Sequence, residues 1–422
     1  MASKNRPNTY DGYICPDRLP PVKPKGRRKK DPDEKFFIRT HQAFEIWFAQ
    51  ILDELEFART LISTDYVPEH DIPPIEHHVR RAAEIFNLIR DHLPLLETLQ
   101  TTSFYDFRSQ LFGSSGRDSY RFREVEWLMG FLDPKLEKYV SGKVEFEKGL
   151  MEEKKRLPRG KVPKNDKEGS RTQNEVVYPT RDEQEFHSLM DYRKTCKNLI
   201  ENLDTLPREL KSRKNRLRDL DQNGTLRSKV VEWLDRAVFP SPGGKTPPRK
   251  SHSPHFSARF QEVYLKAYSN DLKKLGALGK LHGDHGKRLK AEASRKIDLY
   301  FRKRYRCAIV FTLQFADQPL LAWPASLIEA LLVLDQAFSN FRDRHLAMVA
   351  RVLGGGRIST HGEEGSGIPY LQKTLAKRVF PELWDARTFL LSHEEAQDVY
   401  KKREKNWGEW KYHRLVYERP PR

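Results

Sequence analysis

The sequence predicts an all-α protein, and two observations carry that prediction. Apolar residues recur at alternating steps of three and four along several long segments, which is the spacing of one face of an amphipathic helix. Polar–apolar alternation of the kind that indicates strands never extends beyond a few residues, and no internal repeat is visible. A chain of 422 residues, 37% of them hydrophobic, is long enough for a substantial core.

The elements can be followed from the N-terminus. Residues 1–34 form a Pro-rich, basic arm that contains the isolated motif "YDGYI", and the helical period then runs from Lys35 to about Ser63. "DIPPIEHHVRRAAEIFNLIRDHLPLLETLQ" predicts a second helix, which the proline pair starts and which we expect to be interrupted near Pro94. "SFYDFRSQLFGSSG" begins helical and ends in a Gly/Ser loop, and "SYRFREVEWLMGFL" resumes the helical pattern.

The middle of the chain is more polar. Residues 140–180 are basic and poor in apolar residues, which favours a partly flexible insertion. Helices are predicted over Phe186–Leu203 and over "LRSKVVEWLDRAV", with charged sequence between them, and Pro240–Pro254 is a Pro/Gly linker. Three more helical patterns follow the linker: "FSARFQEVYLKAYSNDLKKL", "RYRCAIVFTLQF" and "PASLIEALLVLDQAFSNFRDRHLAMVARVLGGG".

Charge raises the question of an acidic partner. Lys and Arg number 77 against 59 Asp and Glu, a formal charge of +18. Much of the excess lies in Lys23–Lys30 and in residues 143–167, where Pro and Gly interrupt the basic runs, as in solvated or flexible segments. No RNA-binding, zinc-finger or basic-zipper signature accompanies them, so we expect no nucleic-acid partner.

Cysteine usage and hydropathy bear on the compartment. The only cysteines, Cys15, Cys196 and Cys307, are widely spaced, which argues against a disulfide framework and fits a reducing compartment. The sequence shows neither a secretory leader nor an uninterrupted apolar run of membrane length. We therefore expect a cytoplasmic protein with no membrane association.

Two histidines lie where hydrophobic residues belong. His41 falls on an apolar stripe between Phe37 and Phe44, and His345 follows Phe341 by four and precedes Met348 by three. An imidazole among aromatic rings needs a hydrogen-bond partner, and for either one alone the ordinary interpretation is a core histidine bonded to a carbonyl. Two such histidines on two long helices favour a shared ligand.

A haem is the natural candidate for that ligand. It is a flat apolar disc that helices can sandwich, and its iron takes an imidazole nitrogen. The sequence has no Cys-x-x-Cys-His motif, so the haem would be held non-covalently. Zinc is disfavoured because no His-Glu-x-x-His motif or clustered carboxylates accompany either histidine.

Several blocks, in order along nearly the whole chain, resemble those of the tryptophan 2,3-dioxygenases. The "YDGYI" motif of the arm and "FPELWDARTFLL" near the end extend the resemblance. The principal blocks are "FFIRTHQAFEIWFAQILDEL", "SFYDFRSQLFGSSG", "LRSKVVEWLDR", "PLLAWPASLIEALLVLDQAFSNFRDRHLAMVARVLG" and "GSGIPYLQKT".

The resemblance implies a single all-helical domain over residues 1–422, with haem b as cofactor, ferrous in the active form, and a homotetrameric assembly. His345 matches the axial ligand of the haem iron, and Ser115 matches a serine near a haem propionate. His41 matches the distal histidine that contacts the indole N–H of the substrate. The other substrate-binding residues that the resemblance implies are the aromatic walls Phe37 and Phe104, the carboxylate-binding Arg108, and Tyr10, Tyr13 and Ile14 of an arm that reaches a neighbouring subunit.

The residues themselves agree with part of this assignment. Arg108 follows Phe104 by four positions, so the two share a helical face and could grip one amino acid at both ends. A guanidinium also offers a planar fork that matches a carboxylate. For Arg108 an ordinary surface position, and for Tyr10 an ordinary arm tyrosine, remain open.

One segment departs from the family pattern. The usual Gly-Thr-Gly-Gly-Ser-Ser-Gly loop reads here "RISTHGEEGSG" (Arg357–Gly367), is two residues longer, and contains Glu363 and Glu364. Thr360 is the best match for the threonine that contacts the substrate ammonium group. The altered loop leaves the haem assignment intact and makes the substrate less certain.

We therefore expect a haem-dependent oxidoreductase that inserts O₂ across the indole C2–C3 bond of L-tryptophan and yields N-formylkynurenine. Three alternatives remain open at this point. The first is a related oxygenase of specialised metabolism that acts on a modified tryptophan or another aromatic substrate. The second is a non-enzymatic haem protein with both histidines on iron, and the third is a nucleic-acid binder that uses the basic arm.

Overall fold

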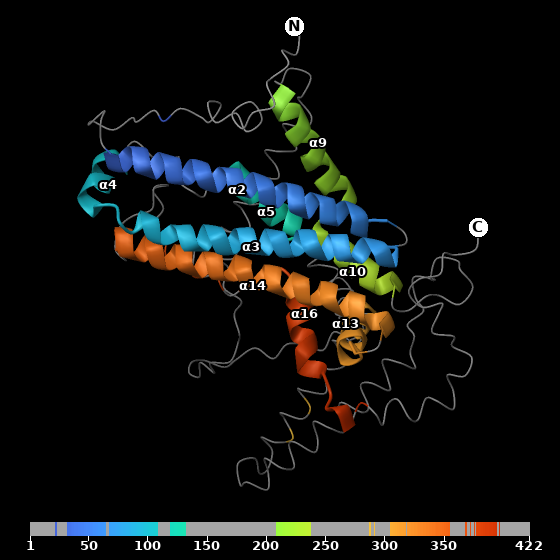
Figure 1. The fold of residues 1–422 in the computed structure, drawn as a ribbon. Coiled ribbons are helices and arrows are strands. Elements are labelled where there is room, and N and C mark those ends of the chain that lie inside the picture. Colours follow the sequence, from blue (N-terminus) through green and yellow to red (C-terminus); the bar gives the residue numbers. More distant parts are fainter. Residues whose placement is uncertain are drawn as a thin grey trace, which may run out of the picture. The chain divides into compact units, whose positions relative to one another are not determined.

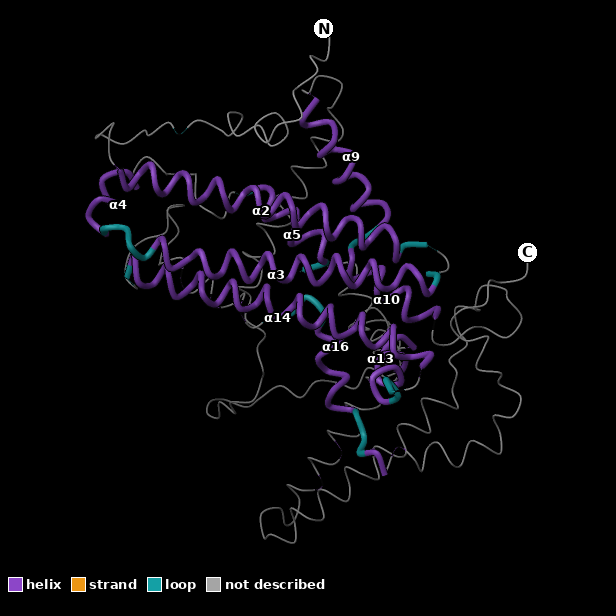
Figure 2. Tube along the Cα trace, viewed as in Figure 1, coloured by secondary structure: helices purple, strands orange, loops and turns teal. Residues whose placement is uncertain are grey.

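The part of the chain that can be described is helical. The computed structural model describes residues 22, 32–64, 67–108, 119–131, 208–237, 287, 291, 304–317, 319–354, 368, 372, 375, 377–394 and 396. Over these residues the elements are α-helices with two short 3₁₀ turns and no strand (Figures 1 and 2), so the all-α prediction is confirmed. The insertion 140–180, the linker Pro240–Pro254 and the helices predicted over Phe186–Leu203 and residues 256–275 lie outside the described residues.

Helix α2 spans Pro32–Ile62 and begins earlier than the sequence indicated. Proline fits the first helical position because its missing N–H has no intrahelical acceptor there, and Asp33 and Glu34 favour the positive end of the helix dipole. Residues 32–34, predicted as the end of the arm, therefore belong to α2. The predicted apolar stripe is buried over its later turns, at Phe44, Phe48, Ile51 and Leu55.

Helix α3 spans Ile72–Leu96 and follows the 3₁₀ turn η2, Glu69–Asp71. The interruption predicted near Pro94 is wrong, because the helix continues through Pro94 to Leu96. A proline in the last turn removes one backbone hydrogen bond, and burial of Leu93 and Leu96 on the same helix compensates for that loss. The chain then turns at Glu97, whose N–H donates to the Pro94 carbonyl over 3.1 Å.

Two short helices follow. Helix α4 spans Thr101–Arg108 and buries Phe104 and Phe107. Helix α5 spans Tyr120–Met129, and the Ser119 hydroxyl caps it by accepting the N–H of Phe122 over 3.2 Å.

The longest helix among the described residues is α14, Pro319–Leu353. Its predicted apolar stripe is confirmed, because Leu334, Phe338, Phe341, Met348 and Val352 are all buried. Gly354, with a φ of 68°, follows the last helical residue in the left-handed conformation that ends many helices.

Within α14, residues Leu321–Leu353 are long and apolar enough to cross a membrane by length and composition, with a mean hydropathy of 1.3 over the most apolar window. This differs from the expectation that the chain has no apolar run of membrane length. In the structure 67% of that window is buried inside the protein, as in a core helix of a globular domain.

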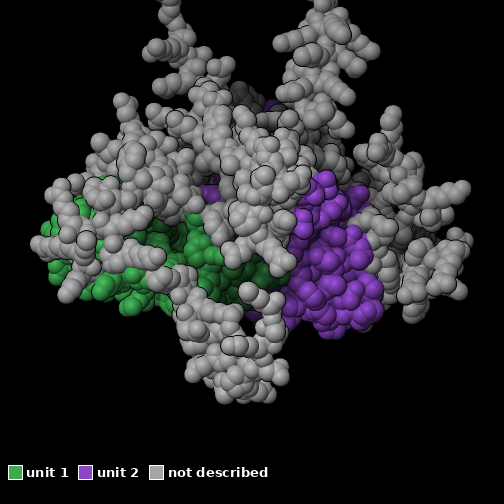
Figure 3. All heavy atoms as spheres, turned by 90° about the horizontal axis from the view of Figure 1, so that it is seen from above, with its two compact units in different colours: residues 1–53, 82–122, 337–376 green, residues 54–81, 123–336, 377–422 purple. Residues whose placement is uncertain are grey.

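The chain divides into two compact units (Figure 3), and long helices contribute to both. Unit 1 comprises residues 1–53, 82–122 and 337–376. Phenylalanines form its core: Phe86 of α3 lies 5.3 Å from Phe338 and 6.0 Å from Phe341 of α14, between ring centroids. Phe48 of α2 reaches the same cluster, with its ring centroid 6.3 Å from that of Phe341.

Unit 2 comprises residues 54–81, 123–336 and 377–422. Beside the remaining parts of α2, α3, α5 and α14 it contains α9 (Arg208–Asn223), α10 (Leu226–Ala237), α13 (Arg304–Gln314), α16 (Pro381–Ala386) and the 3₁₀ turn η6 (Arg387–Phe389). Helix α13 contacts both α10 and α16.

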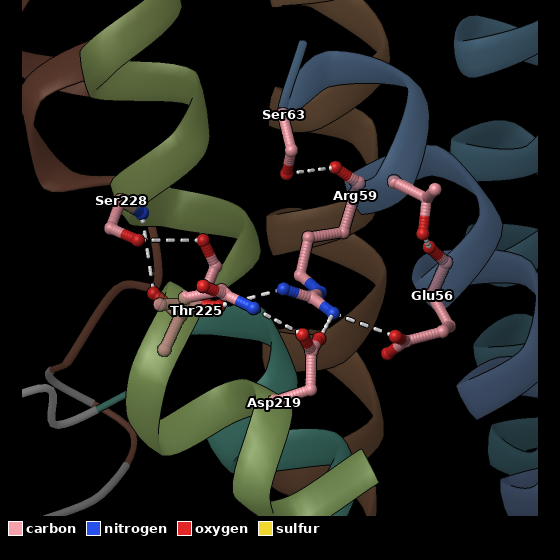
Figure 4. Close-up of polar contacts among 9 residues, drawn as sticks. Glu56, Arg59, Ser63, Asp219, Thr225 and Ser228 are labelled. Atoms are coloured by element: carbon pink, nitrogen blue, oxygen red, sulfur yellow. Dashed lines mark hydrogen bonds and ion pairs between the residues drawn. The ribbon is translucent and has the colours of Figure 1, made fainter. Parts of the chain in front are cut away.

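Helix α9 is not predicted by the sequence, because its residues are mostly charged and lie between two predicted helices. Among the α9 side chains that the structure describes, residues 215–220, 222 and 223, the buried apolar ones are Leu217 and Leu220, so the apolar periodicity is weak there. Ion pairs contribute to its contacts instead: Arg59 of α2 binds Asp219 of α9 and the Gly224 carbonyl just after α9 (Figure 4). Long-range pairs of this kind leave no pattern in the local sequence.

A buried carboxylate fixes the C-terminal part of unit 2. Asp335 of α14 is fully buried and accepts the N–H groups of Val379 and Phe380 over 3.0 and 3.1 Å. It also accepts the indole N–H of Trp384 over 2.9 Å. These three donors compensate for burying the charge and attach the start of α16 to the middle of α14.

Candidate functional site

His41 lies on α2, and its ring nitrogens have different roles. Nδ1 is 2.8 Å from the carbonyl oxygen of Phe37, four residues earlier. Burial lowers the pKa of His41, and the bond to the carbonyl opposes that shift only in part, so the ring is neutral at pH 7. Because a carbonyl can only accept, Nδ1 carries the proton, and Nε2 is left as an acceptor.

This geometry confirms the ordinary interpretation of His41, a histidine bonded to a carbonyl. The bond occupies only one of the two ring nitrogens. Nε2 can therefore still accept a hydrogen bond from an N–H group of a ligand.

Aromatic rings surround His41. The ring of Phe37 lies 4.0 Å from the imidazole, and it also contacts Phe104 and Phe107 of α4 at 5.7 and 5.5 Å, between centroids. Phe104 and Phe107 meet edge-to-face at 5.3 Å. The structure thus brings together Phe37, His41 and Phe104, three of the predicted site residues.

Phe107 was missed by the sequence reasoning. It follows Phe104 by three positions on the same short helix, which places the two rings on one face. That spacing was the signal that could have identified it.

Arg108 is the last residue of α4 and is half-buried. It belongs to the same unit as the aromatic wall and follows Phe104 by one helical turn. Its position is therefore compatible with the predicted grip on one amino acid by an aromatic face and a guanidinium.

His345 lies on α14 beside Phe341, with the two rings stacked at 6.2 Å between centroids. The pKa of His345 is lowered to about 4. Burial is the larger cause, and the proximity of His41 is the smaller one. The imidazole is neutral at pH 7 and has a lone pair to offer.

The two histidines thus lie close enough to interact electrostatically, although they come from opposite ends of the sequence. Both are half-buried, so each retains accessible surface within its apolar surroundings. Near His345, Phe341 also contacts Phe48 and Phe122, with the Phe122 ring at 5.8 Å.

The donor set suits a haem. A neutral imidazole is a common axial ligand for haem iron, and phenylalanine rings provide the apolar walls that a porphyrin needs. Two imidazoles on separate helices, α2 and α14, match a flat group held between helices.

The remaining predicted site residues are not placed. Tyr10, Tyr13 and Ile14 of the arm, Ser115, and Thr360 of the altered loop lie outside the described residues.

Comparisons with known proteins match most of the chain to one family. The family model described as tryptophan 2,3-dioxygenase matches residues 2–238 and 246–390. A protein of Ralstonia nicotianae named tryptophan 2,3-dioxygenase 2 is 30% identical over 364 residues, which cover 85% of this chain and 86% of that protein. Tryptophan 2,3-dioxygenases of Sorangium cellulosum and Mayetiola destructor are 29% and 27% identical, covering 88% and 85% of this chain and 80% and 79% of their own.

Proposed function

The chain belongs to the tryptophan 2,3-dioxygenase family and is a dioxygenase-type oxidoreductase, and from that premise we propose how its site works. The substrate is L-tryptophan, whose indole C2–C3 bond is cleaved with O₂ to give N-formylkynurenine. The cofactor is haem b, with its iron ferrous in the active form.

One observation supports this proposal above the others. His41 and His345 are both neutral, come from different helices, and lie close enough to interact, in surroundings of phenylalanine. A neutral imidazole is needed both to ligate iron and to accept a hydrogen bond from an indole N–H.

His345 would hold the haem iron through an imidazole nitrogen, and Ser115 would lie near a propionate. When bound, the haem supplies the oxygen-activating chemistry. The side chains of the protein place the substrate against it and exclude water from the reacting ring.

His41 would orient the indole. Since Nδ1 donates to the Phe37 carbonyl, Nε2 is the atom that accepts the indole N–H. This contact holds the ring in one orientation without requiring His41 to remove a proton. Phe37, Phe104 and Phe107 would contact the faces and edges of the indole.

Arg108 would bind the substrate carboxylate through its planar fork. Thr360, in the altered loop Arg357–Gly367, would contact the ammonium group. Together the two contacts distinguish an amino acid from a bare indole.

The assembly is also part of the proposal. The protein would form a homotetramer in which Tyr10, Tyr13 and Ile14 of one subunit complete the site of a neighbour. Light scattering of the full chain and of a chain lacking residues 1–20 would test this, and a native monomer with full activity would rule it out.

Product analysis tests the reaction itself. The haem-loaded protein is reduced anaerobically and mixed with L-tryptophan and ¹⁸O₂, and the product is analysed by mass spectrometry. We expect N-formylkynurenine that contains two labelled oxygen atoms. An unchanged substrate, or a product with one labelled atom, would contradict a dioxygenase acting on free tryptophan.

A further inference from the structure

Glu97 lies in the turn between α3 and α4, and its carboxylate is nearly buried, with 8% of the side chain exposed. Each of its oxygens pairs with a different arginine of α14. Oε1 is 2.7 Å from Nη1 of Arg344, an ion pair whose angles are not those of a hydrogen bond, and Oε2 is 3.2 Å from Nη1 of Arg351.

The two arginines are seven positions apart, so they lie about two turns apart on nearly the same face of the helix. His345 directly follows Arg344, within the segment that the carboxylate spans. One buried side chain therefore contacts both ends of the two turns that carry the proposed iron ligand.

A second contact reaches the same part of α14. The hydroxyl of Tyr105, on α4, donates a weak hydrogen bond to the Leu353 carbonyl over 3.5 Å. Leu353 is the last residue of α14, where carbonyl groups have no partner within the helix. All of these residues belong to unit 1, so residues 97–105 hold residues 344–353 at three points.

We infer that Glu97 is a positioning residue that fixes the turn of α14 carrying His345. Glu97 directly precedes the segment that leads into α4, where Phe104 and Arg108 lie. It therefore also fixes the position of His345 relative to these substrate-binding side chains. The inference rests on the proposed function for the identity of the group that His345 holds. The contacts themselves do not depend on it.

The two ion pairs should differ in how strongly they hold α14. Arg344 is 32% exposed, whereas Arg351 is 71% exposed and its pair is correspondingly screened by solvent. Arg344 should therefore transmit most of the effect. Removing the Glu97 charge leaves the guanidinium of Arg344 partly buried and without its carboxylate. This should destabilise the end of α14 more than the loss of a surface ion pair would.

Hydrogen exchange of the haem-free protein tests the positioning directly. Glu97→Gln should speed exchange of backbone amides in residues 344–353 by about ten-fold, the factor for about 1.4 kcal/mol of lost local stability. The matched control is Glu54→Gln, because Glu54 is also buried, with 3% of its side chain exposed, and pairs with His78 and Arg81. It should leave exchange of residues 344–353 unchanged.

The haem-loaded protein provides the second readout. Glu97→Gln should release haem about ten-fold faster, the low end of the effect of losing a group bonded to the ligand itself, because Glu97 acts on His345 only through the helix. It should also shift the iron–histidine stretching frequency of the reduced protein in resonance Raman spectra. Glu54→Gln should change neither.

Arginine variants show whether Glu97 acts through Arg344. Arg344→Gln should reproduce both effects and carries the test if Glu97→Gln does not fold, whereas Arg351→Gln should stay close to the wild type. The double variant Glu97→Gln/Arg344→Gln should be no worse than the more affected single variant, because both remove one interaction.

The outcomes separate the two hypotheses. If haem binding is the same in the wild type and in His345→Ala, the proposed function fails, and exchange still decides the role of Glu97. If Glu97→Gln and Arg344→Gln match Glu54→Gln in exchange, haem release and Raman frequency, the positioning role is wrong.

Discussion

His41 of α2 and His345 of α14 lie close enough that burial, which has the larger effect, and the proximity of His41 together lower the pKa of His345 to about 4. Burial also lowers the pKa of His41 itself. Each histidine is thus kept neutral by apolar surroundings, and a positive charge on either would disfavour one on the other. The proximity of two uncharged imidazoles is the basis for assigning His345 as the iron ligand, which the first prediction tests.

Replacing His345 by alanine should abolish tight haem retention. The residues on either side, Arg344 and Leu346, have no side chain suited to ligate iron in its place. The measurement is Soret absorbance per protein after gel filtration of the reconstituted variant. His92→Ala is the control, since His92 is a half-buried histidine of the same unit that stacks on Phe44.

A wild-type Soret band together with full turnover in His345→Ala would show that the iron ligand has been misassigned. Loss of haem from His92→Ala as well would point to a general disturbance of unit 1.

Replacing Arg108 by leucine should impair turnover of L-tryptophan while haem content stays normal. Truncating one partner of a buried guanidinium–carboxylate pair costs ~2–5 kcal/mol, because the other charge is left unpaired. The expected fall in kcat/KM is therefore on the order of 30- to 4,000-fold. Arg108→Lys should rescue only in part, because a point charge cannot reproduce the two-pronged contact.

Tryptamine, which lacks the carboxylate, is the control substrate for Arg108. Its turnover, already poor, should barely change in Arg108→Leu. Equal damage to both substrates, or unchanged kinetics with tryptophan, would make Arg108 a structural residue.

Replacing Asp335 by asparagine should destabilise the protein. Asp335 receives three N–H donors, and an amide offers one acceptor oxygen while its NH₂ group faces a donor. We expect the unfolding free energy to fall by roughly 1–3 kcal/mol, the range for leaving a buried donor without an acceptor. Calorimetric melting measures the change.

Asp343→Asn is the matched control, because Asp343 is an exposed aspartate of the same helix. Its effect should stay within about 0.5 kcal/mol, as for most surface substitutions. Equal melting temperatures for the two variants would contradict the anchoring role of Asp335.

Cys307 should be inert toward thiol reagents in the folded protein. Burial raises its pKa from 9.0 to about 12, so almost no thiolate exists at pH 8. In a Cys15→Ser/Cys196→Ser background, where Cys307 is the remaining cysteine, a colorimetric thiol assay at pH 8 should detect reaction only after denaturation. Rapid reaction of the native protein would be incompatible with this environment.

The same shift gives a pH dependence. A thiol whose pKa is higher in the folded state stabilises the protein below its unfolded pKa, and that contribution is lost as the pH rises from 9 toward 12. Cys307→Ala in the same background should therefore show a weaker loss of stability with rising pH over this interval.

The sequence by itself determined the features that depend on residues close together in the chain. The three-and-four spacing predicted α2, α3 and α14, placed His41 and His345 on their apolar faces, and put Phe104 and Arg108 one turn apart, because these are properties of a single helix. The resemblance of its blocks also identified the family. Prediction failed where local signals were weak or misleading, at Pro32, Pro94 and the charged helix α9.

Only the tertiary structure decided the relations between distant segments. Three relations join residues from segments far apart in the sequence. They are the proximity of His41 and His345, the pairing of Glu97 with Arg344 and Arg351, and the bonds of the buried Asp335 to the chain before α16. The protonation state of an imidazole and the number of partners of a carboxylate depend on which segments pack around them and exclude water. A spacing pattern along one segment does not contain that information.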